Sequence, residues 1–153
     1  MPINSTKRLL SEIKSLQKNK TEGIYIECVG ESVNHFKALI RALDGPYQGG
    51  FFLFDVNCKD RYPICPPKVK LLNTRSSIRI HPNLYGNGKV CLSILGTWAG
   101  PSWSPSMGIE AVLLNLQSLV CMDEPIQGEP GYVNKKKPDY TEYVSQATLC
   151  QFI

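Results

Sequence analysis

The sequence is poor in the features that mark membrane proteins, zinc domains and disulfide-stapled folds. No segment approaches the run of about 18 apolar residues that a transmembrane helix needs, and the N-terminus lacks the apolar core of a secretory signal. The six cysteines never form the close CxxC pairs that hold zinc. Because 153 residues can bury a core without disulfides, we expect reduced thiols, mostly small buried hydrophobes, in a cytosolic or nuclear protein that binds no membrane.

The chain also has no large excess of positive or negative charge, and it lacks motifs that bind nucleotides or metals or that hydrolyse sugars. Lys and Arg total 17 against 13 Asp and Glu, a net charge of +4, and they are scattered along the chain, so we expect no nucleic-acid partner. The one basic run, 135–137, is interpreted as a solvated loop, with polyanion binding as the alternative. The phosphate-binding patterns GxxxxGK(S/T) and GxGxxG are absent, and so are short-spaced carboxylate pairs. We expect neither a cofactor nor a metal.

The hydrophobic pattern predicts a single domain over residues 1–153. Leucine and isoleucine at helical spacing predict an amphipathic helix over 6–18. Runs of β-branched and aromatic residues predict four strands, over 24–29, 36–43, 51–56 and 69–72. The short turns between the first three strands favour an antiparallel meander, since parallel pairing needs long crossovers.

Two further helices are predicted near the C-terminus. Ser104 and Pro105 resemble an N-cap and a first-turn proline, and an apolar helix face follows them: Ile109, Val112, Leu113, Leu116 and Val120. Asp139 and Glu142 resemble a capping box at the start of a last helix. That helix is expected to turn four residues inward: Tyr140, Tyr143, Val144 and Ala147. Together, the predicted helices and strands indicate an α+β fold with helices grouped around an antiparallel sheet.

Residues 76–105 follow no regular pattern, which inside a compact domain usually marks a functional segment. This stretch contains His81, Asn83 and Cys91. In a purely structural interpretation, Cys91 is one more core thiol and Asn83 closes a turn. The other histidine, His35, falls at a strand edge, where packing is favoured over catalysis.

Four motifs stand in a fixed order along the chain. They are Tyr47-Gln48-Gly49-Gly50-Phe51-Phe52, then Tyr62-Pro63-Ile64-Cys65-Pro66-Pro67-Lys68-Val69, then His81-Pro82-Asn83 with Cys91-Leu92, and finally Trp103-Ser104-Pro105. Their sequences and order resemble the ubiquitin-conjugating (E2) enzyme family over almost the whole chain. The resemblance implies the UBC fold, in which a four-stranded antiparallel meander is flanked by an N-terminal, a central and a C-terminal helix.

A closer likeness surrounds Cys91. The segments 83–85 and 87–98, and an Asn-free variant of a family motif at 128–132, resemble the Z subfamily of these enzymes. The stretch between Cys91 and Trp103 is also longer than in the ordinary family pattern.

The resemblance implies a thioester enzyme. Cys91 would accept the C-terminal glycine of ubiquitin, or of a ubiquitin-like protein, from an activating enzyme (E1). It would then pass this modifier to a substrate lysine or to a cysteine of a ligase (E3). Asn83 would stabilise the oxyanion of the tetrahedral intermediate, or, alternatively, only pin the cysteine loop. His81 and Pro82 would brace that loop, which makes His81 a structural residue.

One position departs from the family pattern. Many E2 enzymes have an aspartate two residues after the cysteine, where it orients or deprotonates the incoming lysine, and this chain has Ser93. A hydroxyl supplies no negative charge, so another carboxylate has to act or lysine attack is slower. The candidates are Asp123, Glu124 and Glu129, each of which could equally be a solvated loop residue.

The resemblance also implies two partner surfaces. On the first helix, Lys7, Arg8 and Lys14 match the basic face that E2 enzymes offer to an acidic domain of the E1, with an ordinary solvated face as the alternative.

The second surface would bind an E3 ligase of the RING type, and ligases of the HECT type are further expected partners. Ile64 represents one loop of this surface, and Pro105 and Ser106 represent the other. Ile64 replaces the usual aromatic anchor, which implies an altered choice of ligase.

Two other functions compete with an active E2. One is a non-catalytic ubiquitin-binding variant of the same fold, but such variants typically lack the cysteine that is present here. The other is an unrelated Cys–His hydrolase that uses His81, and it lacks an obvious acid to orient the histidine.

Overall fold

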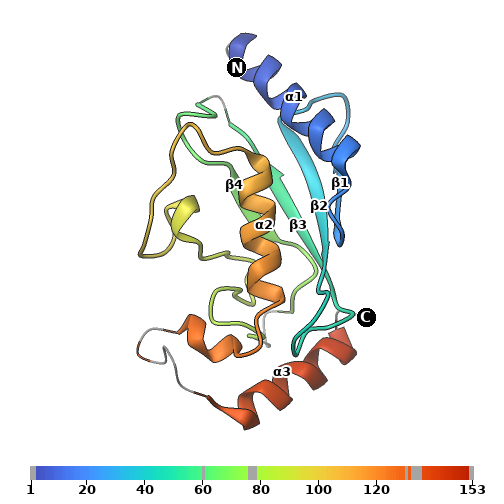
Figure 1. The fold of residues 1–153 in the computed structure, drawn as a ribbon, viewed down its shortest axis with the longest axis vertical. Helices are drawn as coiled ribbons and strands as arrows, with labels where there is room; N and C mark the ends of the chain where they lie inside the picture. The colour runs from blue at the N-terminus through green and yellow to red at the C-terminus, as the bar shows by residue number, and fades with distance from the viewer. Residues whose placement is uncertain (1–2, 60, 76–78, 130, 132–135, 152–153) are drawn as a thin grey trace.

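The computed structural model describes residues 3–59, 61–75, 79–129, 131 and 136–151. The chain runs through a helix, four strands, an irregular segment and two further helices (Figure 1). Their bounds are α1 Ile3–Asn19, β1 Ile24–Cys28, β2 His35–Arg41, β3 Phe51–Asn57, β4 Lys68–Leu71, α2 Ile109–Val120 and α3 Pro138–Gln151. Two short 3-10 helices, η1 Ser93–Leu95 and η2 Pro125–Gly128, flank α2 in the sequence. The predicted α+β fold is confirmed.

The four strands form one antiparallel sheet in the order β1-β2-β3-β4, as a meander requires. Side chains on one face alternate into the core because the side-chain period of a strand is two. The core residues from the central strands are Phe36, Ala38 and Ile40 of β2 and Phe52, Phe54 and Val56 of β3, all fully buried. Helix α2 lies across this face (Figure 1), with its predicted apolar stripe buried against it.

Helix α3 begins within one residue of its expected start, whereas α2 begins later than expected, and the caps predicted for both helices differ from those observed. Helix α2 starts at Ile109 with Gly108 as its N-cap, so the prediction that Ser104 caps it was wrong. Helix α3 starts at Pro138, which places Asp139 inside the first turn, and the predicted capping box was also wrong. Tyr143 was expected inward and is 47% exposed, whereas Thr148, one turn beyond Val144, is buried.

A network around Glu12 joins α1 to α2. The Glu12 carboxylate accepts hydrogen bonds from the Arg8 Nε (2.7 Å), the Tyr62 hydroxyl (2.5 Å) and the Ile109 backbone N–H (2.9 Å). Arg8 also donates from Nη2 to the Met107 carbonyl at 2.7 Å. The first N–H groups of a helix lack partners within it and favour negative charge, so Glu12 caps α2 from another element.

The described residues bear on the expectations about cysteines, membrane spans and metals. Cys28, Cys58, Cys65, Cys91 and Cys121 are unpaired thiols, of which only Cys58 and Cys91 are buried, so the expectation that most of the cysteines are buried was wrong for the described ones; the side chain of Cys150 lies outside the described part. No described helix is both long and apolar enough to cross a membrane. In the described ranges, no group of three or more His, Cys, Asp or Glu side chains is placed to hold a metal. Lys135 of the basic run is outside these ranges.

Candidate active site

Cys91 and Asn83 lie on two neighbouring stretches of the irregular segment after β4. Isolated bridges Leu84↔Val90 and Lys70↔Lys89 hold this segment to itself and to the edge of the sheet. The two residues then bond to each other in both directions: the Cys91 N–H donates to the Asn83 carbonyl, and the Asn83 Nδ2 donates to the Cys91 carbonyl, each at 2.9 Å. Asn83 therefore fixes the backbone on both sides of the thiol-bearing carbon.

The Asn83 side chain is enclosed and only partly satisfied. Its Oδ1 is buried and has no hydrogen-bond partner among the described residues. The backbone of Gly128 in η2 packs directly on this oxygen, so closely that a Cβ at residue 128 would overlap it. An unpartnered buried oxygen typically costs about 1–3 kcal/mol, which indicates that the fold retains this side chain at some expense. The sequence placed Gly128 in the 128–132 motif but did not reveal this contact, because it joins two segments that lie far apart along the chain.

His81 is fully buried and braces the same loop. Its Nδ1 accepts the Asn83 N–H at 2.9 Å, so the proton of the neutral ring is on Nε2, which faces the Met122 sulfur at 3.1 Å. Burial, and then the nearby Arg79 guanidinium, lowers the pKa of His81 to about 3. The ring is therefore neutral at physiological pH. Among the described residues His81 has no hydrogen bond to Cys91, which leaves a Cys–His hydrolase without its base.

Thr97 is a further residue of the cysteine loop that the sequence did not reveal. Its Oγ1 accepts the Leu92 N–H at 3.0 Å and donates to the Val90 carbonyl at 2.8 Å. These two bonds bracket Cys91 from the residues before and after it. A threonine in an irregular segment carries no pattern that would have identified this role.

The Cys91 side chain is closed off in this conformation, since the residue is only 1% exposed. Thiolates act as nucleophiles only where a partner can reach them. Any reaction at Cys91 therefore requires the surrounding loops to open.

The carboxylates proposed to replace the missing aspartate lie in different surroundings. Glu129 pairs with Arg79 at 3.3 Å, and Arg79 in turn donates to the Pro82 carbonyl at 2.6 Å. Glu124 faces helix α3, where it accepts from the Thr141 hydroxyl at 3.5 Å, and Asp123 is exposed. Of the three, Glu129 is the one tied to the segment that carries Asn83. Ser93 lies in η1, and no described hydrogen bond or ion pair joins these four residues to Cys91.

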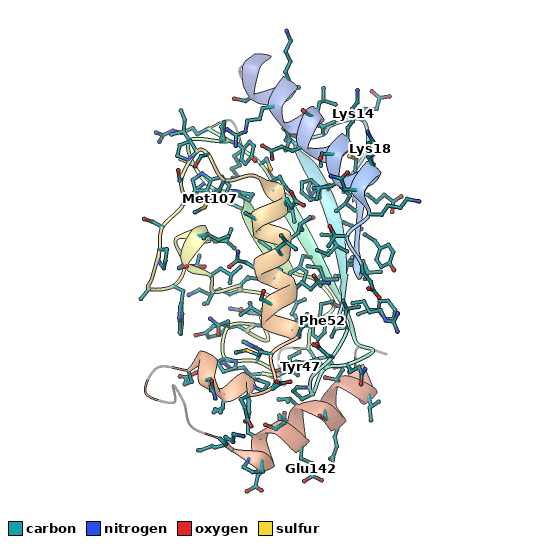
Figure 2. All side chains as sticks on the ribbon, viewed as in Figure 1. Lys14, Lys18, Tyr47, Phe52, Met107 and Glu142 are labelled. Atoms are coloured by element: carbon teal, nitrogen blue, oxygen red, sulfur yellow. The ribbon has the colours of Figure 1, made fainter. Side chains whose placement is uncertain are left out.

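The basic residues of α1 do not share one environment. Lys7 and Lys14 are exposed on one helix face, and Lys18 continues that face (Figure 2). Arg8 is committed to Glu12 and Met107. The basic face is therefore formed by lysines, and Lys18 extends it beyond the three residues predicted from the sequence.

The two loops expected to bind a ligase are brought together. Trp103 donates from Nε1 to the Pro63 carbonyl at 2.7 Å, and its ring lies 6.0 Å from that of Tyr62. This contact joins the loop of Ile64 to the loop of Pro105 and Ser106. Ile64 is 65% exposed, and the other two residues are exposed as well.

Comparison with known proteins gives consistent results. Residues 8–149 match the model of the ubiquitin-conjugating enzyme family. The chain is 42% identical over 148 residues to the ubiquitin-conjugating enzyme E2 Z of Danio rerio and to that of Homo sapiens. These alignments cover 93% of this chain but 45% and 42% of the relatives, so the chain spans less than half of their length.

A solved structure supports the same assignment. The E2 domain of a Toxoplasma gondii ubiquitin conjugating enzyme superimposes with a TM-score of 0.75 at 26% sequence identity, covering 96% of this chain and 98% of that one. Fold, motif order and relatives agree on one answer: the chain belongs to the ubiquitin-conjugating enzyme family, within its Z subfamily.

Proposed function

We propose that the protein conjugates ubiquitin or a ubiquitin-like protein through a thioester on Cys91. The Cys91 thiolate attacks the thioester between the E1 and the C-terminal glycine of the modifier. The new thioester forms on Cys91, and the E1 cysteine leaves as a thiolate. A substrate lysine amine, or an E3 cysteine, then attacks the carbonyl and displaces Cys91. The observation that carries this proposal is the position of Cys91 in a loop fixed by Asn83 and Thr97, in a chain of this family.

We assign Asn83 two tasks that do not exclude each other. An amide NH₂ has two protons, and one of them is used by the Cys91 carbonyl. The other is available to an oxyanion that develops at the thioester carbon. Donors of this kind typically contribute about 2.7–4 kcal/mol to the transition state. His81 and Pro82 act one step further away, by holding Asn83.

Activation of the incoming lysine needs a negative charge that Ser93 does not supply. We propose that one carboxylate among Asp123, Glu124 and Glu129 supplies it. Glu129 is favoured because Arg79 ties it to the 81–83 segment.

Two surfaces complete the proposal. Lys7 and Lys14, with Arg8 as a structural support, would contact the E1. Ile64, Pro105 and Ser106 would contact RING-type ligases, and HECT-type ligases would receive the modifier on their own cysteine. The thiol chemistry suits a reducing compartment, so we place the protein in the cytoplasm or nucleus.

The test is a thioester assay with purified protein, ATP, Mg²⁺, modifier and a panel of E1 enzymes. A band on a non-reducing gel that reductant removes, and that Cys91→Ala abolishes, is the expected result. Asn83→Ala is expected to slow discharge to lysine by about 10²–10³-fold. The absence of a band with every E1 and modifier would contradict the proposal and favour a non-catalytic ubiquitin-binding variant.

A further inference from the structure

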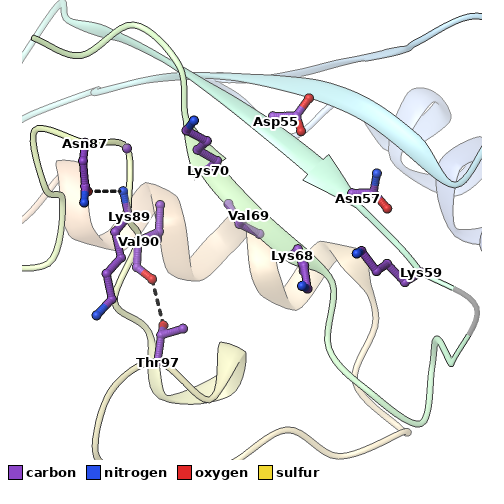
Figure 3. A pocket seen from close by; sticks show the side chains of 11 residues that line it. Asp55, Asn57, Lys59, Lys68, Val69, Lys70, Asn87, Lys89, Val90 and Thr97 are labelled. Atoms are coloured by element: carbon purple, nitrogen blue, oxygen red, sulfur yellow. Dashed lines mark hydrogen bonds between the residues drawn. The ribbon is translucent and has the colours of Figure 1, made fainter.

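A groove of about 460 Å³ follows the β4 edge of the sheet, next to the loop that carries Cys91 (Figure 3). Side chains from the outer face of β3 and β4 form one side, and the 87–90 segment with Thr97 forms the other. Four of its lining residues are lysines: Lys59, Lys68, Lys70 and Lys89. The groove lies outside the E1 and E3 surfaces proposed above.

The positive charge of this groove is only partly offset from within, by Asp55, which lies opposite Lys70 in the β3–β4 register. Asp55 is the one acidic residue of the lining, and its carboxylate is paired with the His35 Nε2 at 2.7 Å. Across the described ranges (3–59, 61–75, 79–129, 131 and 136–151), no carboxylate forms an ion pair with any of the four lysines. The Lys89 ammonium lies 5.5 Å from the centre of the Tyr85 ring, and the other three ammonium groups form no described ion pair, so an external anion can approach them.

The backbone places two of these lysines on adjoining segments. Lys70 and Lys89 form an isolated antiparallel bridge at the β4 edge, although their side chains extend in different directions (Figure 3). Gly88 makes the approach possible: at φ +89° it lies so close to β4 that a Cβ would sit 2.6 Å from the Leu71 carbonyl oxygen and 2.9 Å from the Lys70 Cε. The fold thus brings two lysine-bearing backbone segments to the same edge of the groove.

The groove and the cysteine loop share residues. Val90 and Thr97 line the groove, and the hydrogen bond from Thr97 Oγ1 to the Val90 carbonyl brackets Cys91. A chain segment that occupies the groove is therefore held beside the loop where transfer takes place.

We propose that this groove binds an acidic, extended segment of the protein substrate, adjacent to the lysine that receives the modifier. The inference deepens the proposed function and rests on it for its biological role. Lysines supply the charge, and the amides of Asn57 and Asn87 line the same groove and suit a peptide backbone. The lining has no aromatic side chain and no arginine, although base stacking on aromatic residues is typical of single-stranded nucleic-acid sites. An acidic polypeptide is therefore the ligand that fits.

The first test measures binding to the uncharged protein. A fluorescein-labelled peptide with one lysine followed by four acidic residues is titrated and followed by anisotropy, beside a Gln-substituted neutral peptide and an oligouridine of equal charge. We expect saturable binding of the acidic peptide alone, weakened as salt rises, because screening acts on exposed charges. Equal binding of the neutral peptide, or preferential binding of the oligouridine, would overturn the proposal.

Matched variants locate the site. Lys68→Glu/Lys70→Glu is expected to weaken binding of the acidic peptide at least about tenfold and to gain binding of a lysine-rich peptide, since the charge pattern is reversed. Lys68→Arg/Lys70→Arg is expected to retain binding. Lys136→Glu/Lys137→Glu changes the net charge equally, outside the groove, and is expected to bind as the wild type does. If both double Glu variants lost the same affinity for the acidic peptide, the effect would be one of net charge, and binding in the groove would be contradicted.

A transfer assay separates this inference from the proposed function. Discharge from Cys91 is compared for free lysine, the acidic peptide and the neutral peptide. Discharge to free lysine with no preference for the acidic peptide, in wild type, would refute the groove while the conjugating function stands. Binding of the acidic peptide by a protein that never forms a thioester would refute the conjugating function while the groove stands.

Discussion

At the scale of single residues, the imidazole of His81 is held with both nitrogens occupied and no access to water. In an unfolded chain a histidine has a pKa near 6.5, whereas burial lowers that of His81 to about 3 in the fold. At a pH between these two pKa values, the unfolded state has a proton on His81 that the native state does not have. The part of the free energy of unfolding that depends on a neutral His81 is therefore fully present above pH 6.5. It is lost progressively as the pH falls toward 3.

We expect His81→Asn to reduce this loss. The amide oxygen of the new side chain can accept the Asn83 N–H in place of Nδ1, and it does not titrate. Urea unfolding between pH 7 and pH 4 should show a free energy of unfolding that falls less steeply in the variant, by up to about 1.4 kcal/mol per pH unit.

His35→Asn provides the control, because it removes the other histidine, which is half-exposed and paired with Asp55. Wild type and His81→Asn have the same carboxylates, so the difference between their two slopes isolates the buried histidine. If the free energy of unfolding fell equally steeply with pH in wild type and in His81→Asn, the buried imidazole would not contribute to the loss of stability in acid.

The sequence predicted which polar residues meet, but only in part how they meet. The order of His81, Asn83 and Cys91 in the family motif was enough to place them in one loop. Thr97 and Gly128 could not be found in this way, because their importance arises from contacts across the fold, a bracket around Cys91 and a backbone packed on Asn83. Burial of Cys91 is likewise a property of the assembled loops and not of any local pattern.

At the scale of elements, the strands were predicted within one or two residues, whereas the starts of α1 and α2 were not. Strands alternate between core and solvent, and that alternation is written in each segment. The start of α2 depends on Glu12, nearly a hundred positions earlier in the chain, whose carboxylate accepts the Ile109 N–H. A cap supplied by another element leaves no local signal, so Ser104 and Pro105 were mistaken for it.

Glu12→Ala is expected to destabilise the protein by more than about 3 kcal/mol, because hydrogen bonds to charged groups contribute about 1.5–3 kcal/mol each and three of them end on this carboxylate. The measurement is chemical unfolding at pH 7.

Glu110→Ala is the matched control for Glu12→Ala. This glutamate lies in the first turn of the same helix and is exposed, so its loss should cost less than about 1 kcal/mol. Equal costs for the two variants would mean that the charge near the helix start matters and the network does not.

At the scale of the whole molecule, the enclosure of Cys91 makes its reactivity a measure of how the structure opens. We expect iodoacetamide to modify Cys91 at least about tenfold more slowly than the half-exposed Cys65, because the reagent meets the thiol only in an opened state. Peptide mapping by mass spectrometry after timed quenching gives both rates in one sample.

Denaturant below the unfolding transition should increase the Cys91 rate selectively and leave that of Cys65 nearly constant. Comparable rates in buffer would indicate that the loops around Cys91 are open for much of the time in solution.

The Arg8–Met107 hydrogen bond has a mechanical consequence for how partners share this molecule. Arg8 is anchored to α1, and Met107 ends the segment that begins at Trp103, itself bonded to the Ile64 loop. The faces that we propose for E1 and E3 are thus connected through two hydrogen bonds. We expect a bulky partner on one face to limit access to the other through the space that it occupies.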